Sequence, residues 1–103
     1  MELMTMGSTL KSVSYANFLD LYHDQLDKNF NLRLGQLFHI LFIKDDDNSI
    51  ASSIFNSDGT DAIHLITEWM EHTQTPYGNM IVPKKNLSAM PKKLKNLIKF
   101  NKE

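Results

Sequence analysis

The 103-residue sequence contains no cysteine, which excludes disulfide bridges, thiolate zinc sites and cysteine nucleophiles. Its longest purely apolar run, Ile40 to Ile43, is far shorter than the roughly 18 residues of a membrane-spanning helix. The first residues, MELMTMGSTLKS, lack the basic start and apolar centre of a secretory signal. We therefore expect a cytoplasmic protein without a membrane segment.

The usual catalytic signatures are also missing, among them GxSxG, GxxxxGK[ST], GxGxxG and HExxH. The acidic run Asp45–Asp47 does not continue as a calcium-binding loop, because Ile50 stands where that loop requires glycine. His64, Glu68 and His72 are spaced to share one helix face, but a zinc site needs a further ligand or an ordered water. Metal binding by this stripe stays open, while we expect no enzymatic activity and no cofactor.

Opposite charges are concentrated in the two parts of the chain. Residues 1–72 carry eleven acidic and four basic side chains, a net charge of −7, whereas residues 73–103 carry seven lysines and Glu103, a net charge of +6. Such asymmetry indicates an acidic partner, a nucleic acid, or contacts between copies of the chain through the acidic core and the basic tail.

Apolar residues recur at helical spacing from Ser14, a good N-cap, onward. The first predicted helix has its apolar positions at Tyr15, Phe18, Leu19, Tyr22 and Leu26. A second predicted helix begins at Asn29 or Asn31, ends near Lys44 and is apolar nearly all round, which is typical of the centre of a bundle. A strand over residues 37–43 is the competing interpretation.

Gly35 interrupts this second helix at a cost of about 1 kcal/mol relative to alanine, so we expect a close approach by the first or the fourth helix. Arg33 and Gln36 flank the glycine, and we predict an ion pair between Arg33 and Asp61. His39 is predicted to be a hydrogen-bonded histidine at the edge of the core. These residues are assigned structural roles.

The remaining elements are shorter or follow turn signals. Asp45–Asp47 are expected to cap a third helix that contains Ile50, Ile54 and Phe55. Thr60 or Asp61 is expected to cap a fourth helix with inward residues Ile63, Ile66, Trp69 and Met70. A brief strand is predicted over residues 80–82, and Pro91 suits the first turn of a last helix.

The predicted fold is therefore all-α: a small single-domain bundle of four to five helices with a basic C-terminal amphipathic helix. Residues 1–13 are expected to be a flexible arm, residues 14–75 an acidic helical core, and residues 76–103 a loop and the basic helix of the same domain. In that helix, four lysines spaced by three, four and three residues would share one face. The predicted partner-binding set is Lys84, Lys85, Lys92, Lys93, Lys95, Lys99 and Lys102. The alternative is an ordinary solvated face.

The stretch from Tyr15 to His72 resembles a group of small uncharacterised phage and prophage proteins. The resemblance rests on the pair Phe18-Leu19, the motif RLGQ at residues 33–36, the acidic turn at residues 58–61 and Trp69. It covers a little over half of the chain, and the basic segment from Pro76 onward departs from the pattern. The group has no established activity to transfer.

Together these features predict a non-enzymatic phage accessory protein that binds and modulates or inhibits a host protein with an acidic surface, such as one of an anti-phage defence system. The alternative is a nucleic-acid-binding regulator that uses the basic helix. The tail lacks arginine and has Phe100 as its single aromatic residue after Tyr77, which disfavours base reading. Whether the basic helix docks on its own core or on a partner stays open.

Overall fold

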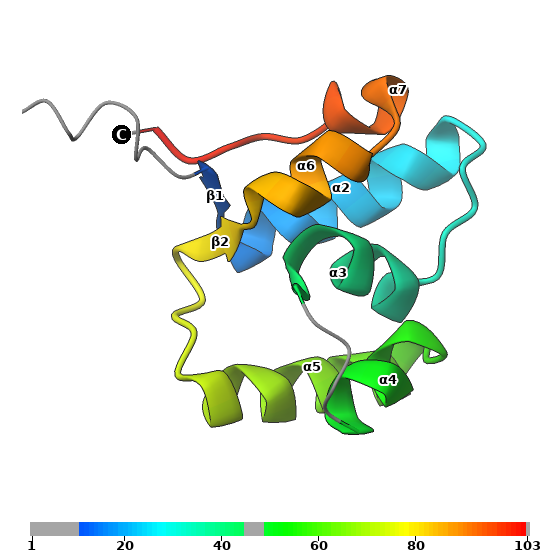
Figure 1. Ribbon diagram of the computed structural model, residues 1–103. Coiled ribbons are helices and arrows are strands. Elements are labelled where there is room, and N and C mark those ends of the chain that lie inside the picture. The colour runs from blue at the N-terminus through cyan, green and yellow to red at the C-terminus, as the bar shows by residue number, and fades with distance from the viewer. Residues whose placement is uncertain (1–10, 45–48, 103) are drawn as a thin grey trace, which may run out of the picture.

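The computed structural model describes residues 11–44 and 49–102, which form six helices and a small antiparallel sheet of two strands (Figure 1). The prediction of a mostly helical small domain is confirmed, but the fold is not purely α. The elements are β1 (Lys11–Val13), α2 (Tyr15–Asp27), α3 (Leu34–Phe42), α4 (Ser49–Phe55), α5 (Gly59–Thr73), β2 (Met80–Val82), α6 (Lys84–Ala89) and α7 (Lys92–Lys95). None of these helices is long and apolar enough to cross a membrane.

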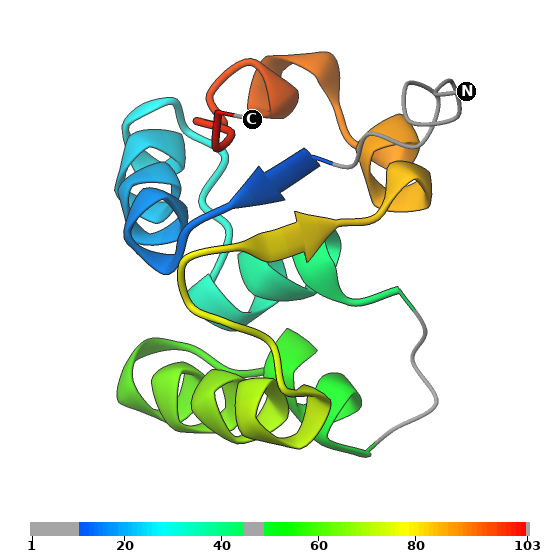
Figure 2. The same ribbon diagram turned by 90° about the vertical axis from the view of Figure 1, so that its left-hand side faces the viewer.

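The two strands come from opposite ends of the chain and pair with Val13 opposite Met80 (Figure 2). Val13, Met80 and Val82 are buried, so the sheet contributes directly to the core. The brief strand predicted over residues 80–82 is therefore confirmed. The flexible arm predicted for residues 1–13 is wrong for Lys11–Val13, because their backbone pairs with β2; residues 1–10 lie outside the described part.

Helix α2 begins as predicted. The side-chain oxygen of Ser14 accepts a hydrogen bond from the Asn17 N–H at 3.1 Å, which caps the first turn. Its fully buried residues, however, are Phe18, Leu21 and Gln25. Leu26, expected on the buried stripe, is 37% exposed. The buried face is thus rotated and includes a polar side chain that apolar periodicity cannot detect.

Gln25 explains why the second helix begins later than predicted. Its Nε2 donates to the carbonyls of Tyr22 and Leu32 at 3.0 and 2.9 Å, and its Oε1 accepts from the Leu32 N–H at 2.9 Å. Asn29 and Asn31 adopt positive φ angles of 65° and 58° in the loop between. The Gln25 side chain fixes the conformation of this loop, and α3 starts only after Arg33.

Tyr15, at the start of α2, contacts the loop before β2. Its backbone N–H donates to the Tyr77 carbonyl at 2.7 Å, and the two rings meet edge to face with centroids 5.5 Å apart. Burial raises the pKa of Tyr15 above its usual value, and the nearby Tyr77 hydroxyl raises the pKa further.

Helix α3 lies between α2 and α6 on one side and α4 and α5 on the other (Figures 1 and 2). The ring of Phe38, in the middle of α3, packs edge-on against the rings of Phe18 and Trp69, with centroids 5.4 Å apart in both pairs. The prediction of a central helix is confirmed, and the competing strand is excluded. The residues of α3 that are buried are Leu34, Gly35, Leu37, Phe38, Leu41 and Phe42.

Gly35 is where α3 touches the end of α4. Its N–H donates to the Ser57 carbonyl at 3.2 Å. A Cβ placed on Gly35 would collide with the backbone oxygen of Ile54 and lie 2.7 Å from that of Ser57. The close approach is therefore confirmed, but the neighbour is the end of the third helix, not the first or fourth helix.

The predicted ion pair between Arg33 and Asp61 is wrong. Both residues are exposed, and no ion pair joins them in the described structure. Instead, the Asp58 carboxylate accepts a hydrogen bond from the Leu34 N–H at 3.0 Å, while the Arg33 N–H donates to Gln36 Oε1 at 3.4 Å. An aspartate thus satisfies a free N–H at the start of α3, as helix termini require.

The helices that follow α3 match the sequence periodicity with two exceptions. Helix α4 contains the predicted apolar residues, while its predicted cap, Asp45–Asp47, lies outside the described residues. The predicted cap of helix α5, Thr60 or Asp61, is wrong, because the helix begins earlier, at Gly59, with Asp58 at the N-cap position. Ile63, expected to face inward, is 42% exposed, whereas Trp69 is half-buried against Phe38.

The predicted basic C-terminal helix begins after Pro91 as expected, but it ends at Lys95, so the prediction of a long amphipathic helix is wrong. The helical conformation is unfavourable for a residue that precedes a proline. Met90 is therefore extended, which separates α6 from α7. After α7, the chain runs extended beside β1, where the Asn101 N–H donates to the Ser12 carbonyl at 2.7 Å (Figure 1). Leu94 and Ile98 are buried. The C-terminal segment therefore docks on its own core.

Candidate binding surface

The seven lysines of the predicted set do not share one helix face. Lys84 and Lys85 begin α6, three more lie in α7, and Lys99 and Lys102 follow in the extended segment. Six of the seven are exposed, and Lys95 is half-buried. The structure thus divides the set into separate groups.

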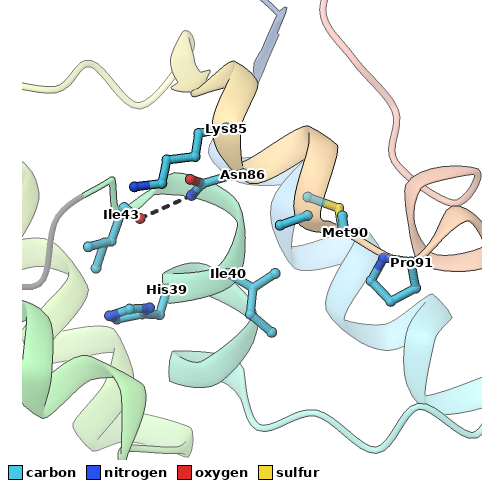
Figure 3. A pocket seen from close by; sticks show the side chains of 8 residues that line it. His39, Ile40, Ile43, Lys85, Asn86, Met90 and Pro91 are labelled. Carbon is cyan, nitrogen blue, oxygen red and sulfur yellow. Dashed lines mark hydrogen bonds between the residues drawn. The ribbon is translucent and has the colours of Figure 1, made fainter.

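The first group is positioned by Asn86. Its Nδ2 donates to the carbonyls of Leu41 and Ile43, at 3.2 and 3.0 Å (Figure 3). Carbonyls at the C-terminus of a helix lack partners within the helix, so one side chain satisfies two of them. Because Asn86 follows Lys84 and Lys85 directly, this bond holds both lysines at the C-terminal end of α3.

A hollow of about 330 Å³, here called the α3–α6 hollow, lies beside this junction. Figure 3 shows Ile40 of α3 pointing toward Met90 and Pro91, while Ile43, which follows α3, lies near Lys85 at the other end. His39 lies on the same side and packs its ring edge-on against Phe55, with centroids 5.1 Å apart. The half-buried position predicted for His39 is confirmed. The complete lining is His39, Ile40, Ile43, Lys85, Asn86, Ala89, Met90 and Pro91.

Three lysines meet around a second hollow of about 410 Å³, the lysine hollow. Its lining is Lys44, Ile81, Pro83, Lys84 and Lys85. Lys85 also lines the α3–α6 hollow, so the two hollows adjoin. A depression lined by three lysines is suited to carboxylates.

A third hollow of about 270 Å³, the Trp69 hollow, lies beside β2 and is mainly apolar. It shares Ile81 and Pro83 with the lysine hollow. Its other lining residues are Phe42, Trp69, Gln74, Thr75, Pro76, Asn79 and Met80. The lysines at the start of α6 are therefore flanked by an apolar depression on each side.

A separate group is formed at α7. Lys93 and Lys28 line a hollow of about 490 Å³ together with Phe30 and Leu97, and Asn29 and Asn96 complete it. None of these residues lines the other three hollows.

The histidine stripe of α5 is exposed to solvent. His64, Glu68 and His72 are all exposed, as is Asp61. Over residues 11–44 and 49–102, no group of three histidine, cysteine, aspartate or glutamate side chains is placed to hold a metal ion.

Lys44, Ile81 and Asn86 contribute to this surface although they are not among the residues predicted for it. Lys44 carried a detectable signal, since it is the basic residue that ends the apolar run of α3. Ile81 and Asn86 carried none, because their roles depend on contacts with β1 and with α3, which are distant in sequence.

Comparisons of the chain with models of known protein families, with curated proteins and with solved structures gave no match.

Proposed function

We propose that this chain is a non-enzymatic binding protein that engages an acidic surface of a partner protein through the lysine hollow. In the phage setting that the sequence resemblance implies, the partner is a host protein, such as one of an anti-phage defence system. The protein would act by occupying that partner's surface.

The observation that supports this proposal is the position of Lys44, Lys84 and Lys85 between two apolar hollows. Protein interfaces commonly combine an apolar centre with charged groups that select the partner and speed its approach. A solvated lysine face would not need apolar depressions beside it. Asn86 adds rigidity, which lowers the entropy lost on binding.

The test is affinity capture from a bacterial lysate with the tagged full chain. The paired change Lys84→Glu and Lys85→Glu should lower the affinity for a captured partner about tenfold or more. The matched change Lys92→Glu and Lys93→Glu alters the net charge equally at α7 and should have a much smaller effect. If no captured protein responds to either pair, or if the α7 pair has the larger effect, the proposal is wrong.

Salt provides a second readout of the same proposal. Exposed charges are screened beyond about 8 Å at physiological ionic strength, so capture should weaken as salt is raised. The loss should be smaller for the Lys84→Glu and Lys85→Glu protein, because it has already lost the attraction.

Binding of nucleic acid through the α7 lysines is the second candidate. It is favoured by the hollow in which Lys28 and Lys93 adjoin the aromatic ring of Phe30, since cations and a stacking surface suit a single strand. However, α7 has four residues and cannot follow a phosphate backbone as the predicted long helix would. Binding to DNA or RNA that falls steeply with salt, and is lost in the Lys92→Glu and Lys93→Glu protein, would support this candidate.

A further inference from the structure

The outer edge of β2 offers unpaired backbone groups beside the lysine hollow. In an antiparallel pair, opposite residues alternate between those that exchange hydrogen bonds and those that do not. Ile81 lies opposite Ser12. If Ser12 and Ile81 exchanged hydrogen bonds, the next bonded residue of the edge would be Pro83, which has no N–H. The register therefore favours bonds between Val82 and Lys11.

Two further hydrogen bonds agree with the pattern in which Ser12 and Ile81 do not exchange hydrogen bonds. The Tyr15 N–H, two residues beyond Val13, donates to the Tyr77 carbonyl on the β2 side. The Ser12 carbonyl is used by the Asn101 N–H. Ser12 and Ile81 are therefore the pair that does not exchange hydrogen bonds, and the N–H and C=O of Ile81 point away from β1.

Outside the ladder with β1, neither backbone group of Ile81 is hydrogen-bonded to another residue in the described structure. No described strand lies along this edge, which is visible in Figure 2 on the side of β2 away from β1. The Ile81 side chain is 41% exposed, although a strand edge with an exposed apolar residue is a pairing site that proteins commonly protect.

The chemistry on the two sides of Ile81 differs. Ile81 and Pro83 line both hollows; beyond Pro83 the lysine hollow continues to Lys84 and Lys85, and before Ile81 the apolar Trp69 hollow continues to Asn79. Side chains of an added strand would alternate between faces while its backbone pairs with Ile81. Lysines select carboxylates at one end, and the apolar hollow selects an aliphatic or aromatic side chain at the other.

We infer that the free edge of β2 receives an extended acidic segment of the partner protein as an additional strand, with Ile81 as the pairing residue. This inference rests on the proposed function, for which it specifies the shape of the partner. Pairing provides two backbone hydrogen bonds at Ile81, because Pro83 ends the edge and the Asn79 N–H is bonded to Pro76. Side-chain contacts in the two hollows must supply the remaining affinity.

A second copy of this chain fits the edge less well. Pairing two β2 edges would bring the lysines of both copies together at one interface, where like charges repel. An acidic segment from another protein removes that repulsion.

The probe is a synthetic eight-residue peptide in which glutamate alternates with valine, titrated into the isotope-labelled full chain and followed by NMR. We expect saturable shifts of the Ile81 and Lys85 amide signals, and hydrogen exchange at the Ile81 amide slowed about tenfold by its new bond. A peptide in which lysine replaces glutamate should cause no such shifts.

The decisive control is the same acidic peptide N-methylated at its central valine, which removes one backbone donor and leaves the side chains in place. It should bind about three- to tenfold more weakly. Equal binding of both peptides, or no binding of either, overturns strand addition, as does Ile81 protection that appears with protein concentration alone. The proposed function is tested separately, because it fails when capture does not depend on Lys84 and Lys85 or depends more on Lys92 and Lys93, whichever result the peptides give.

Discussion

The helical part from α2 to α5 and the C-terminal part from Met80 to Lys102 are stabilised in different ways. The helical part packs large apolar faces around α3, where Phe38 contacts aromatic rings of α2 and α5. The C-terminal part has short elements, and asparagine side chains attach it to distant backbone. Asn86 binds the end of α3, and Asn101 binds Ser12 and Gly78.

The difference shows how a basic segment can belong to the core and still present charge. Leu94 and Ile98 are buried in the same core as the helices, while most of the lysines between and around them face solvent. In the proposed function, the acidic helical part supplies the stable support and the start of α6 supplies the binding groups. Each part can be perturbed by a single substitution.

The largest effect is expected where α3 meets α4. Gly35→Ala should destabilise the protein by about 3 kcal/mol, because the added methyl group collides with the backbone oxygens of Ile54 and Ser57. Thermal unfolding should show a melting temperature more than about 10 °C lower. The folded fraction should still bind the partner.

Gly78→Ala is the matched control, since nothing lies within 4 Å of a Cβ at that position. It should leave the melting temperature nearly unchanged. An unchanged melting temperature for Gly35→Ala as well would contradict the close contact between α3 and α4.

A smaller loss is expected from Gln25→Ala, at about 2 kcal/mol. The substitution removes three hydrogen bonds and leaves the N–H and C=O of the half-buried Leu32 without their partner. Urea unfolding measures the loss. Gln36→Ala, which removes one bond of 3.4 Å at the surface, should change stability by less than about 0.5 kcal/mol. Equal effects of the two variants would mean that the loop between α2 and α3 does not depend on Gln25.

In the C-terminal part, Asn86→Ala should cost about 1 kcal/mol. Native-state hydrogen exchange should become faster in α6, while α4 and α5 keep their protection, because the bond attaches one short element. Asn96→Ala, an exposed asparagine, serves as the control. Uniform loss of protection in all helices would show that the two parts unfold as one unit.

The smallest effect concerns pH, at the contact between α2 and the loop before β2. Because the pKa of Tyr15 is raised in the folded state, the unfolded chain loses this proton first as pH rises. Stability is therefore full below the ordinary tyrosine pKa of about 10 and falls as pH rises through the folded value. Tyr15→Phe should remove this part of the alkaline loss in urea unfolding at several pH values. A variant with the same alkaline slope as the natural protein would exclude Tyr15 as the cause.

The contrast between the helical part and the C-terminal part also explains which features of the fold could be predicted from the sequence. The spacing of apolar residues located α2, α3, α4 and α5, because each buries one face of a periodic segment. It could not show that Gln25 is buried or that Asp58, in place of Asp61, reaches the start of α3, because those contacts depend on tertiary partners. The lysine spacing suggested one long helix after Pro91, but α7 ends at Lys95, and further along the Asn101 N–H bonds to Ser12 beside β1.

The candidate surface was predicted in part. Lys84 and Lys85 were identified from charge alone. Lys44 and Ile81 join them only after α3 and β2 have packed together, because they are separated by more than thirty residues of chain. The five remaining lysines of the predicted set, three in α7 and two in the extended segment, have the same charge but do not line the lysine hollow.

The most direct test of the binding surface is a hydrogen-exchange footprint of the full chain bound to its captured partner. Protection on binding should appear at the end of α3 and over β2 and the first turn of α6, at Lys44 and residues 80–86. Residues 92–97 should exchange as in the free protein. Protection restricted to residues 92–102, with none over β2, would contradict binding through the lysine hollow.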